Sequence, residues 1–76
     1  MSLKLPRITC RQLIQVLKRA GFEEQRQRGS HLTMRRSSDG RRVTVPVHEG
    51  RIIPPGTLRA ILRDADISPD QFHELL

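Results

Sequence analysis

The stretch HLTMRRSSDGRRVTVPVH, residues 31–48, contains two runs in which apolar and polar residues alternate. Such alternation is typical of strands that bury one face, and Asp39-Gly40 between the runs is typical of a tight hairpin turn. The face predicted to pack on a core carries Leu32, Met34, Val43, Val45 and Val47. The opposite face, predicted to stay open, carries His31, Thr33, Arg35, Arg42, Thr44 and His48.

The turn also predicts how the two strands pair. If Asp39-Gly40 supplies the two central residues, Leu32 lies opposite Val47 and His31 lies directly opposite His48. Cβ atoms of such a cross-strand pair are about 4.5–5.5 Å apart. A shift by one residue would bury polar side chains, so only a shift by two competes, and it leaves the histidines as diagonal neighbours.

Helices are predicted on both sides of this hairpin. Residues 9–20 begin with the capping-box pair Thr9 and Gln12 and then repeat apolar residues at helical spacing. Residues 57–67 show the same spacing, and a short last helix is predicted to begin at residues 68–71, SPDQ, a second capping box.

These elements together predict the fold class. Residues 22–29, FEEQRQRG, are expected to form a third strand at the sheet edge. Helices on either side of a three-stranded antiparallel sheet must cover its single apolar face. The predicted class is therefore α+β, with the α-β-β-β-α layout of double-stranded-RNA-binding domains and a short C-terminal helix. Residues 1–76 are expected to form one domain, with residues 1–3 either disordered or an artificial addition.

Charge indicates the kind of partner. The net charge is +6, and all fourteen cationic side chains except Lys4 and Lys18 are arginines. Arginine matches phosphate oxygens with two parallel hydrogen bonds, so a polyanion such as RNA or DNA is the expected partner. The alternative is an arginine-rich surface that is merely solvated. The only aromatic residues are Phe22 and Phe72, which disfavours a binding surface made of stacked rings.

Other features exclude several classes of protein. A single cysteine, Cys10, permits neither an internal disulfide nor a thiolate zinc site, and it suits a reducing compartment. No segment has the length and apolarity of a membrane span, and no signal-peptide pattern is present. A cytoplasmic protein is therefore expected.

In the order in which they occur, three segments resemble the HicA-type mRNA interferase toxins: LIQVLKRAGFEEQRQRGSHLTM (13–34), RRVTVPVH (41–48) and IIPPGTLRAILRDADI (52–67). The resemblance implies a ribonuclease toxin of a type II toxin–antitoxin pair that is neutralised by a HicB antitoxin. It also implies that the histidine after the glycine, here His31, is catalytic. Many family members have a polar residue or histidine directly after it, where this chain has Leu32.

The chemistry of RNA cleavage agrees with this resemblance. Histidine acts as a general acid or base near neutral pH, and RNA carries its own nucleophile, so no cofactor or metal is expected. His31 is predicted to be catalytic, and His48 is either a second catalytic group or a residue that merely ends the strand. RNA is expected to be bound by Arg28, Ser30, Thr33, Arg35, Arg42 and Thr44. His73 is expected to be structural or solvated.

Rival functions remain at this point. A non-catalytic RNA-binding module would need the arginines and be indifferent to His31. A DNA-binding repressor is disfavoured because no helix-turn-helix pattern is apparent. The expected partners are mRNA and a HicB-type antitoxin, and the free toxin is expected to be a monomer.

Overall fold

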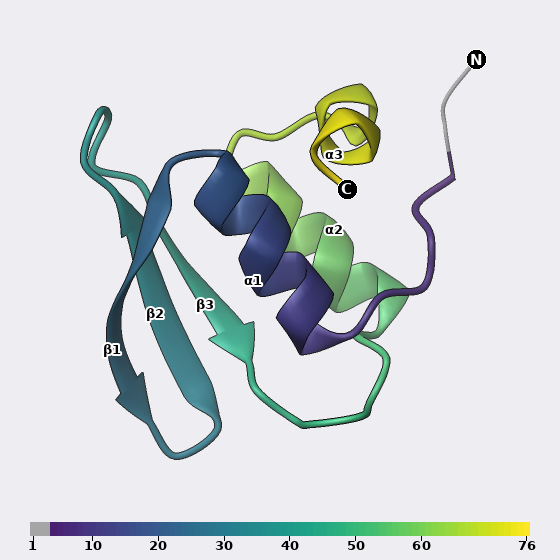
Figure 1. The fold of residues 1–76 in the computed structure, drawn as a ribbon, viewed down its shortest axis with the longest axis horizontal. Helices are drawn as coiled ribbons and strands as arrows, with labels where there is room; N and C mark the ends of the chain where they lie inside the picture. The colour runs from purple at the N-terminus through teal and green to yellow at the C-terminus, as the bar shows by residue number, and fades with distance from the viewer. Residues whose placement is uncertain (1–3) are drawn as a thin grey trace.

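A computed structural model describes residues 4–76 of the chain. Its elements follow the order α1 (Cys10–Arg19), β1 (Phe22–Arg28), β2 (His31–Arg36), β3 (Arg42–Pro46), α2 (Pro55–Asp64) and α3 (Pro69–Leu75) (Figure 1). This order and the antiparallel sheet β1-β2-β3 confirm the predicted α+β class, with β1 at one edge. The expectation for residues 1–3 falls outside the described residues.

Both predicted capping boxes are present. Thr9 Oγ1 accepts a hydrogen bond from the Gln12 backbone N–H at 3.3 Å, and Gln12 Oε1 accepts one from the Thr9 N–H at 2.9 Å. Ser68 and Gln71 repeat the arrangement at the start of α3. Each box satisfies backbone donors that the first helical turn leaves free. Helix α2 begins earlier than predicted, at Pro55, because proline suits the first helical position.

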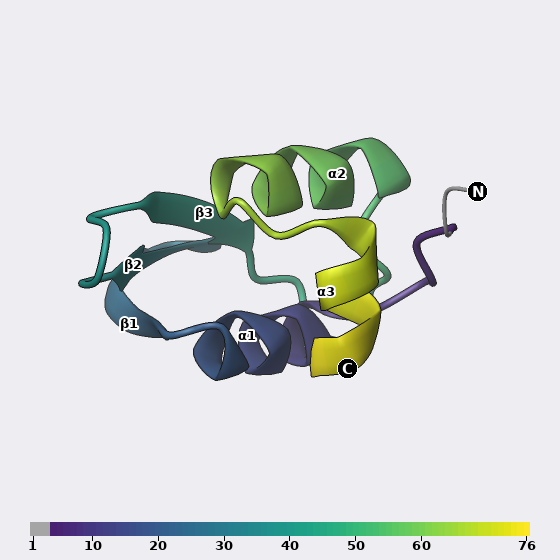
Figure 2. The same ribbon diagram turned by 90° about the horizontal axis from the view of Figure 1, so that it is seen from above.

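The helices lie against the same face of the sheet, where the core forms. Helix α1 contacts β1 and β3, helix α2 contacts β3, and α3 lies between α1 and α2 at the end away from the strands (Figure 2). The predicted inward residues Leu32, Met34, Val43 and Val45 are buried, whereas Val47 is half-buried at the margin of the core. Phe22 and Phe72 are fully buried, so neither ring is available on the open face.

The register predicted first for β2 and β3 is wrong by two residues, and the structure has the competing register, shifted by two. Leu32 lies opposite Val45 rather than Val47, and His31 lies opposite Pro46 rather than His48. A shift by two keeps every side chain on its predicted face, which is why the apolar pattern alone did not distinguish the two registers.

The loop between β2 and β3 is the physical reason for this shift. Arg36 and Arg41 form the last backbone pair, with the Arg36 N–H donating to the Arg41 carbonyl at 2.9 Å, so four residues rather than two make the turn. Asp39 Oδ1 accepts a hydrogen bond from the Arg41 backbone N–H at 3.2 Å, and Gly40 adopts a φ of 74°. The aspartate and glycine therefore stabilise a longer loop than the two-residue turn expected from them.

No helix within residues 4–76 combines the length and apolar character needed to cross a membrane.

Candidate functional site

His31 is positioned by the tight turn between β1 and β2. Arg28 and His31 form the last pair of these strands, and only Gly29 and Ser30 connect them. Gly29 adopts a φ of 55°, a left-handed conformation that glycine accepts at low steric cost. The histidine is consequently the first residue of β2. Its side chain is exposed on the open face, with Arg28 beside it on β1 and Pro46 beside it on β3.

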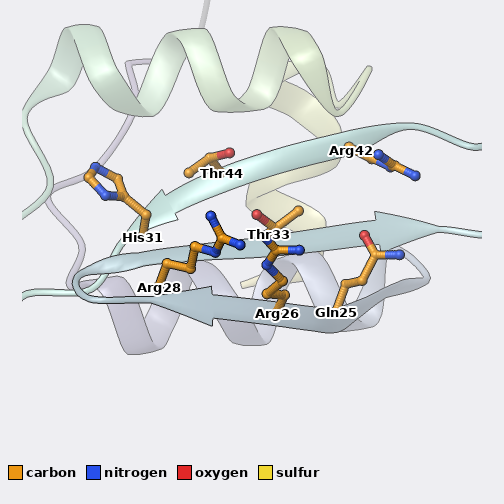
Figure 3. A pocket seen from close by; sticks show the side chains of 7 residues that line it. All are labelled: Gln25, Arg26, Arg28, His31, Thr33, Arg42 and Thr44. Carbon is orange, nitrogen blue, oxygen red and sulfur yellow. The ribbon is translucent and has the colours of Figure 1, made fainter.

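A broad basin of about 630 Å³ covers the open face of the sheet. Its lining residues come from all three strands and are Gln25, Arg26, Arg28, His31, Thr33, Arg42 and Thr44 (Figure 3). His31 lies at one end of the basin, and Gln25 and Arg42 lie toward the other. The basin thus follows the strands, with the imidazole at the end where β2 begins.

The basin is cationic, and no carboxylate lines it among the residues that the structure describes. Its three arginines, Arg26, Arg28 and Arg42, form no ion pair within residues 4–76. The nearest acidic residue by register on this face is Glu23, which lies opposite Arg35 and does not line the basin. Unpaired guanidinium groups around an exposed hollow attract an anion of several charges, and phosphate groups match their geometry.

Other arginines have structural roles. The Arg36 guanidinium pairs with Asp39, donates to the carbonyl oxygens of Ala20 at 3.4 Å and Ala65 at 3.0 Å, and lies 4.7 Å from the centre of the Phe22 ring. Arg41 Nη1 donates to the Asp64 carbonyl at 3.2 Å. These two side chains attach the β2–β3 loop to the helices.

The ion pair at this loop shifts the pKa of both partners. The hydrogen bond from Arg36 lowers the pKa of Asp39 to about 2, and the Arg41 N–H and the two arginine charges act in the same direction. The same hydrogen bond raises the pKa of Arg36. Both groups therefore stay ionised in the folded protein under ordinary conditions.

The structure gathers part of the predicted site. Arg28, His31, Thr33, Arg42 and Thr44 line the basin together. Ser30 lies in the β1–β2 turn, and Arg35 lies half-buried in β2 opposite Arg42; neither lines the basin.

His48 is not brought together with His31 by strand pairing. It follows the end of β3 and lines a second, smaller hollow of about 220 Å³ with Cys10, Ile52 and other residues. Its carbonyl oxygen accepts a hydrogen bond from the Cys10 thiol at 3.8 Å. The catalytic role predicted for His48 stays a prediction, without the direct pairing that suggested it.

His73 lies in α3, where Nε2 is 3.0 Å from the Lys4 carbonyl oxygen, a contact between the first described residues and the last helix.

Among residues 4–76, no group of three or more His, Cys, Asp or Glu side chains is placed to hold a metal ion.

Sequence reasoning missed two basin residues, Gln25 and Arg26. A bulge in β1 explains their position, because Glu24 lies opposite Met34 and Arg26 lies opposite Thr33, with Gln25 inserted between them. In a regular strand that begins with Phe22 facing the core, Arg26 would point toward the helices. Every residue of β1 after Phe22 is exposed, so burial provides no signal that could have revealed the bulge from the sequence.

Comparison with known proteins adds to this geometry. Residues 10–67 match the family model described as HicA toxin of bacterial toxin-antitoxin. This chain belongs to the HicA toxin family. A comparison with curated proteins found no match. The matched segment runs from the first residue of α1 to Ile67, so it contains the whole basin of this HicA-family toxin.

Proposed function

We propose that this HicA-family toxin is an endoribonuclease that cleaves mRNA without a metal ion, with His31 as its catalytic residue. The observation that carries the proposal is the place of His31, an exposed imidazole at the end of the basin. Within residues 4–76, this basin is lined by three arginines without an ion pair and by no carboxylate. RNA is the polyanion that such a site can cleave, because its 2′-hydroxyl supplies the nucleophile.

The reaction needs one proton removed and one supplied. A base takes the 2′-hydroxyl proton, the oxygen attacks the adjacent phosphorus, the bond to the 5′-oxygen breaks, and an acid protonates that leaving oxygen. His31 performs one of these transfers, with water or His48 as the second group. The guanidinium group of Arg28, which lies beside His31, stabilises the charge that develops on the phosphorane. The products are a 2′,3′-cyclic phosphate and a free 5′-hydroxyl.

The experiment compares wild-type protein with His31→Ala and His31→Gln on end-labelled RNA in the presence of a chelator. General acid–base catalysis typically contributes about 10²–10⁴-fold, so both variants should lose activity on that scale. Because His31 is exposed, both should keep the wild-type melting temperature and still bind RNA. An Arg59→Gln protein, altered on the exposed surface of α2, serves as the active control.

The second candidate is a non-catalytic RNA-binding module, which the same unpaired arginines favour. It predicts that wild-type protein and His31→Ala bind RNA equally and that neither cleaves it. Cleavage by wild type that His31→Ala lacks, with binding retained by both, excludes this candidate.

We also propose that a HicB-type antitoxin neutralises the toxin by covering the basin. Carboxylates on the antitoxin would complement the unpaired arginines and exclude RNA from His31. Arg28→Gln/Arg42→Gln should weaken the antitoxin complex, and a non-cleavable RNA should compete with the antitoxin for the toxin. A ternary complex in which RNA still occupies the basin would contradict direct occlusion.

A further inference from the structure

Gln25 is the extra residue of the β1 bulge. The pairs Glu24–Met34 and Arg26–Thr33 are consecutive on β2, so Gln25 has no partner in the sheet. Removing it would join two segments that already have matching register. Bulges commonly redirect side chains near functional sites, so the side chain of the inserted residue is a candidate functional group.

Neither the sheet nor the core uses the Gln25 side chain. It is exposed and makes no side-chain hydrogen bond within residues 4–76. Gln27, two positions along the same strand, differs: its Nε2 donates to the Gly29 carbonyl at 3.0 Å and so stabilises the β1–β2 turn. The two glutamines therefore form a natural pair for comparison, one structural and one free.

The free amide lies inside the basin, at a distance from the catalytic end. Figure 3 shows Gln25 toward the end opposite His31, beside Arg26. By register it lies about three residues along the sheet from the Arg28–His31 pair, which is about 10 Å at about 3.3 Å per residue. A phosphate at His31 would thus place a neighbouring nucleotide of the same RNA, and not the cleaved linkage itself, near Gln25.

The chemistry of an amide differs from that of its neighbours. The basin arginines attract phosphate by charge, whereas a neutral amide offers one acceptor and two donors. That combination matches a base edge with an adjacent donor and acceptor, as adenine has at N6 and N7. Such edges are accessible in single-stranded RNA, because the major groove of an A-form duplex is too deep and narrow for side chains to read.

We propose that Gln25 is a specificity-determining residue that reads one base of single-stranded RNA, close to the nucleotides held at His31. This inference rests on the proposed function for its RNA substrate and deepens it by assigning the residue that selects sequence. In this proposal, the bulge adds a base-reading amide to the cationic basin and leaves the flanking strand pairs unchanged.

The test separates sequence preference from cleavage by using the His31→Ala protein. This protein, alone and combined with Gln25→Ala, deletion of Gln25 or Gln27→Ala, is allowed to select from a random single-stranded RNA library, and the bound RNA is sequenced. Cleavage sites of wild type and Gln25→Ala are mapped in parallel on one long transcript.

We expect a single-position preference in the His31→Ala protein that falls about tenfold or more with Gln25→Ala and with the deletion, and that persists with Gln27→Ala. The same position should lose its preference in the cleavage maps. An unchanged preference, or a uniform loss of affinity for all sequences, would overturn the inference, because the latter is the signature of a phosphate contact. Should the deletion variant not fold, Gln25→Ala decides.

The two proposals fail in different ways. Cleavage by wild type with a preference independent of Gln25 removes the inference and leaves the nuclease. A Gln25-dependent binding preference in a protein that never cleaves RNA removes the nuclease and leaves the inference.

Discussion

Arg36 and Asp39 are joined by two parallel contacts, Nη2–Oδ2 at 2.7 Å and Nε–Oδ1 at 3.1 Å. The same guanidinium reaches the carbonyl oxygens of Ala20 and Ala65, the C-terminal capping residues of α1 and α2. A cation is favourable at a helix C-terminus, where the carbonyl groups are unpaired. One arginine thus connects the β2–β3 loop with the ends of two helices.

Replacing Asp39 with Asn should destabilise the protein at neutral pH and have little effect near pH 2. The folded pKa of Asp39, about 2, lies below the unfolded value of about 3.9. Its ionised form therefore stabilises the fold at pH values above about 4, and this stabilisation is lost as pH falls through about 2. Melting temperatures of both proteins at pH 7, 4 and 2 measure the effect.

Glu49→Gln is the matched control for this prediction. Glu49 pairs with Arg11 at 2.9 Å, but both side chains are more than two-thirds exposed, and such surface pairs contribute little. A melting-temperature difference for Asp39→Asn that is equal at pH 7 and pH 2, or no larger than that of Glu49→Gln, would show that the ion pair does not stabilise the loop.

Substitutions of the adjacent residues Arg35 and Arg36 should affect different properties, RNA binding for Arg35 and stability for Arg36. Arg36→Met leaves the Ala20 and Ala65 carbonyls without their donor, at an expected cost of about 1–3 kcal/mol in the free energy of unfolding. Arg35→Met should keep wild-type stability, because its guanidinium has no ion-pair partner in the described chain. It should weaken RNA binding instead, because Arg35 lies on the open face, opposite the basin residue Arg42. Denaturant unfolding and RNA titration of both variants test this, and the opposite assignment of effects would refute it.

The sequence predicted which face each residue of β2 and β3 occupies, and it failed to predict their register. A period of two assigns Leu32 and Met34 to the core in either register, so the pattern contains no information that separates them. The choice depends on the loop, where Asp39 binds both a side chain and the backbone. That arrangement needs Arg36, whose position depends in turn on Ala65, twenty-nine residues away in the chain.

The candidate site, like the sheet, could be predicted from the sequence only in part. His31, Thr33, Arg42 and Thr44 follow from alternation on the two regular strands. The site residues on the bulged strand β1 were harder to predict, because one inserted residue moves every later side chain of the strand to the opposite face of the sheet. The polar sequence of β1 also has no apolar residue after Phe22 to reveal the reversal.

His48→Ala should retain RNA cleavage within a few-fold of wild type. His48 follows the end of β3 and lines the hollow with Cys10 and Ile52, whereas His31 lines the basin, so the substituted side chain does not belong to the basin wall. Rates measured for both proteins from pH 5 to pH 9 provide the comparison. A loss as large as that of His31→Ala, or loss of one limb of the pH profile only in His48→Ala, would establish His48 as the second proton-transfer group.

RNA binding should depend on salt through the basin arginines specifically. Each phosphate contact to a single strand contributes about 0.7 to the slope of log K against log salt. Arg28→Gln/Arg42→Gln should therefore lower the slope by about 1.4 and weaken binding most at low salt. Arg59→Gln/Arg63→Gln removes the same charge from exposed positions of α2, behind the sheet, and should leave the slope unchanged. Titrations of labelled single-stranded RNA at several salt concentrations give both slopes, and equal decreases in the two double variants would mean that RNA does not bind in the basin.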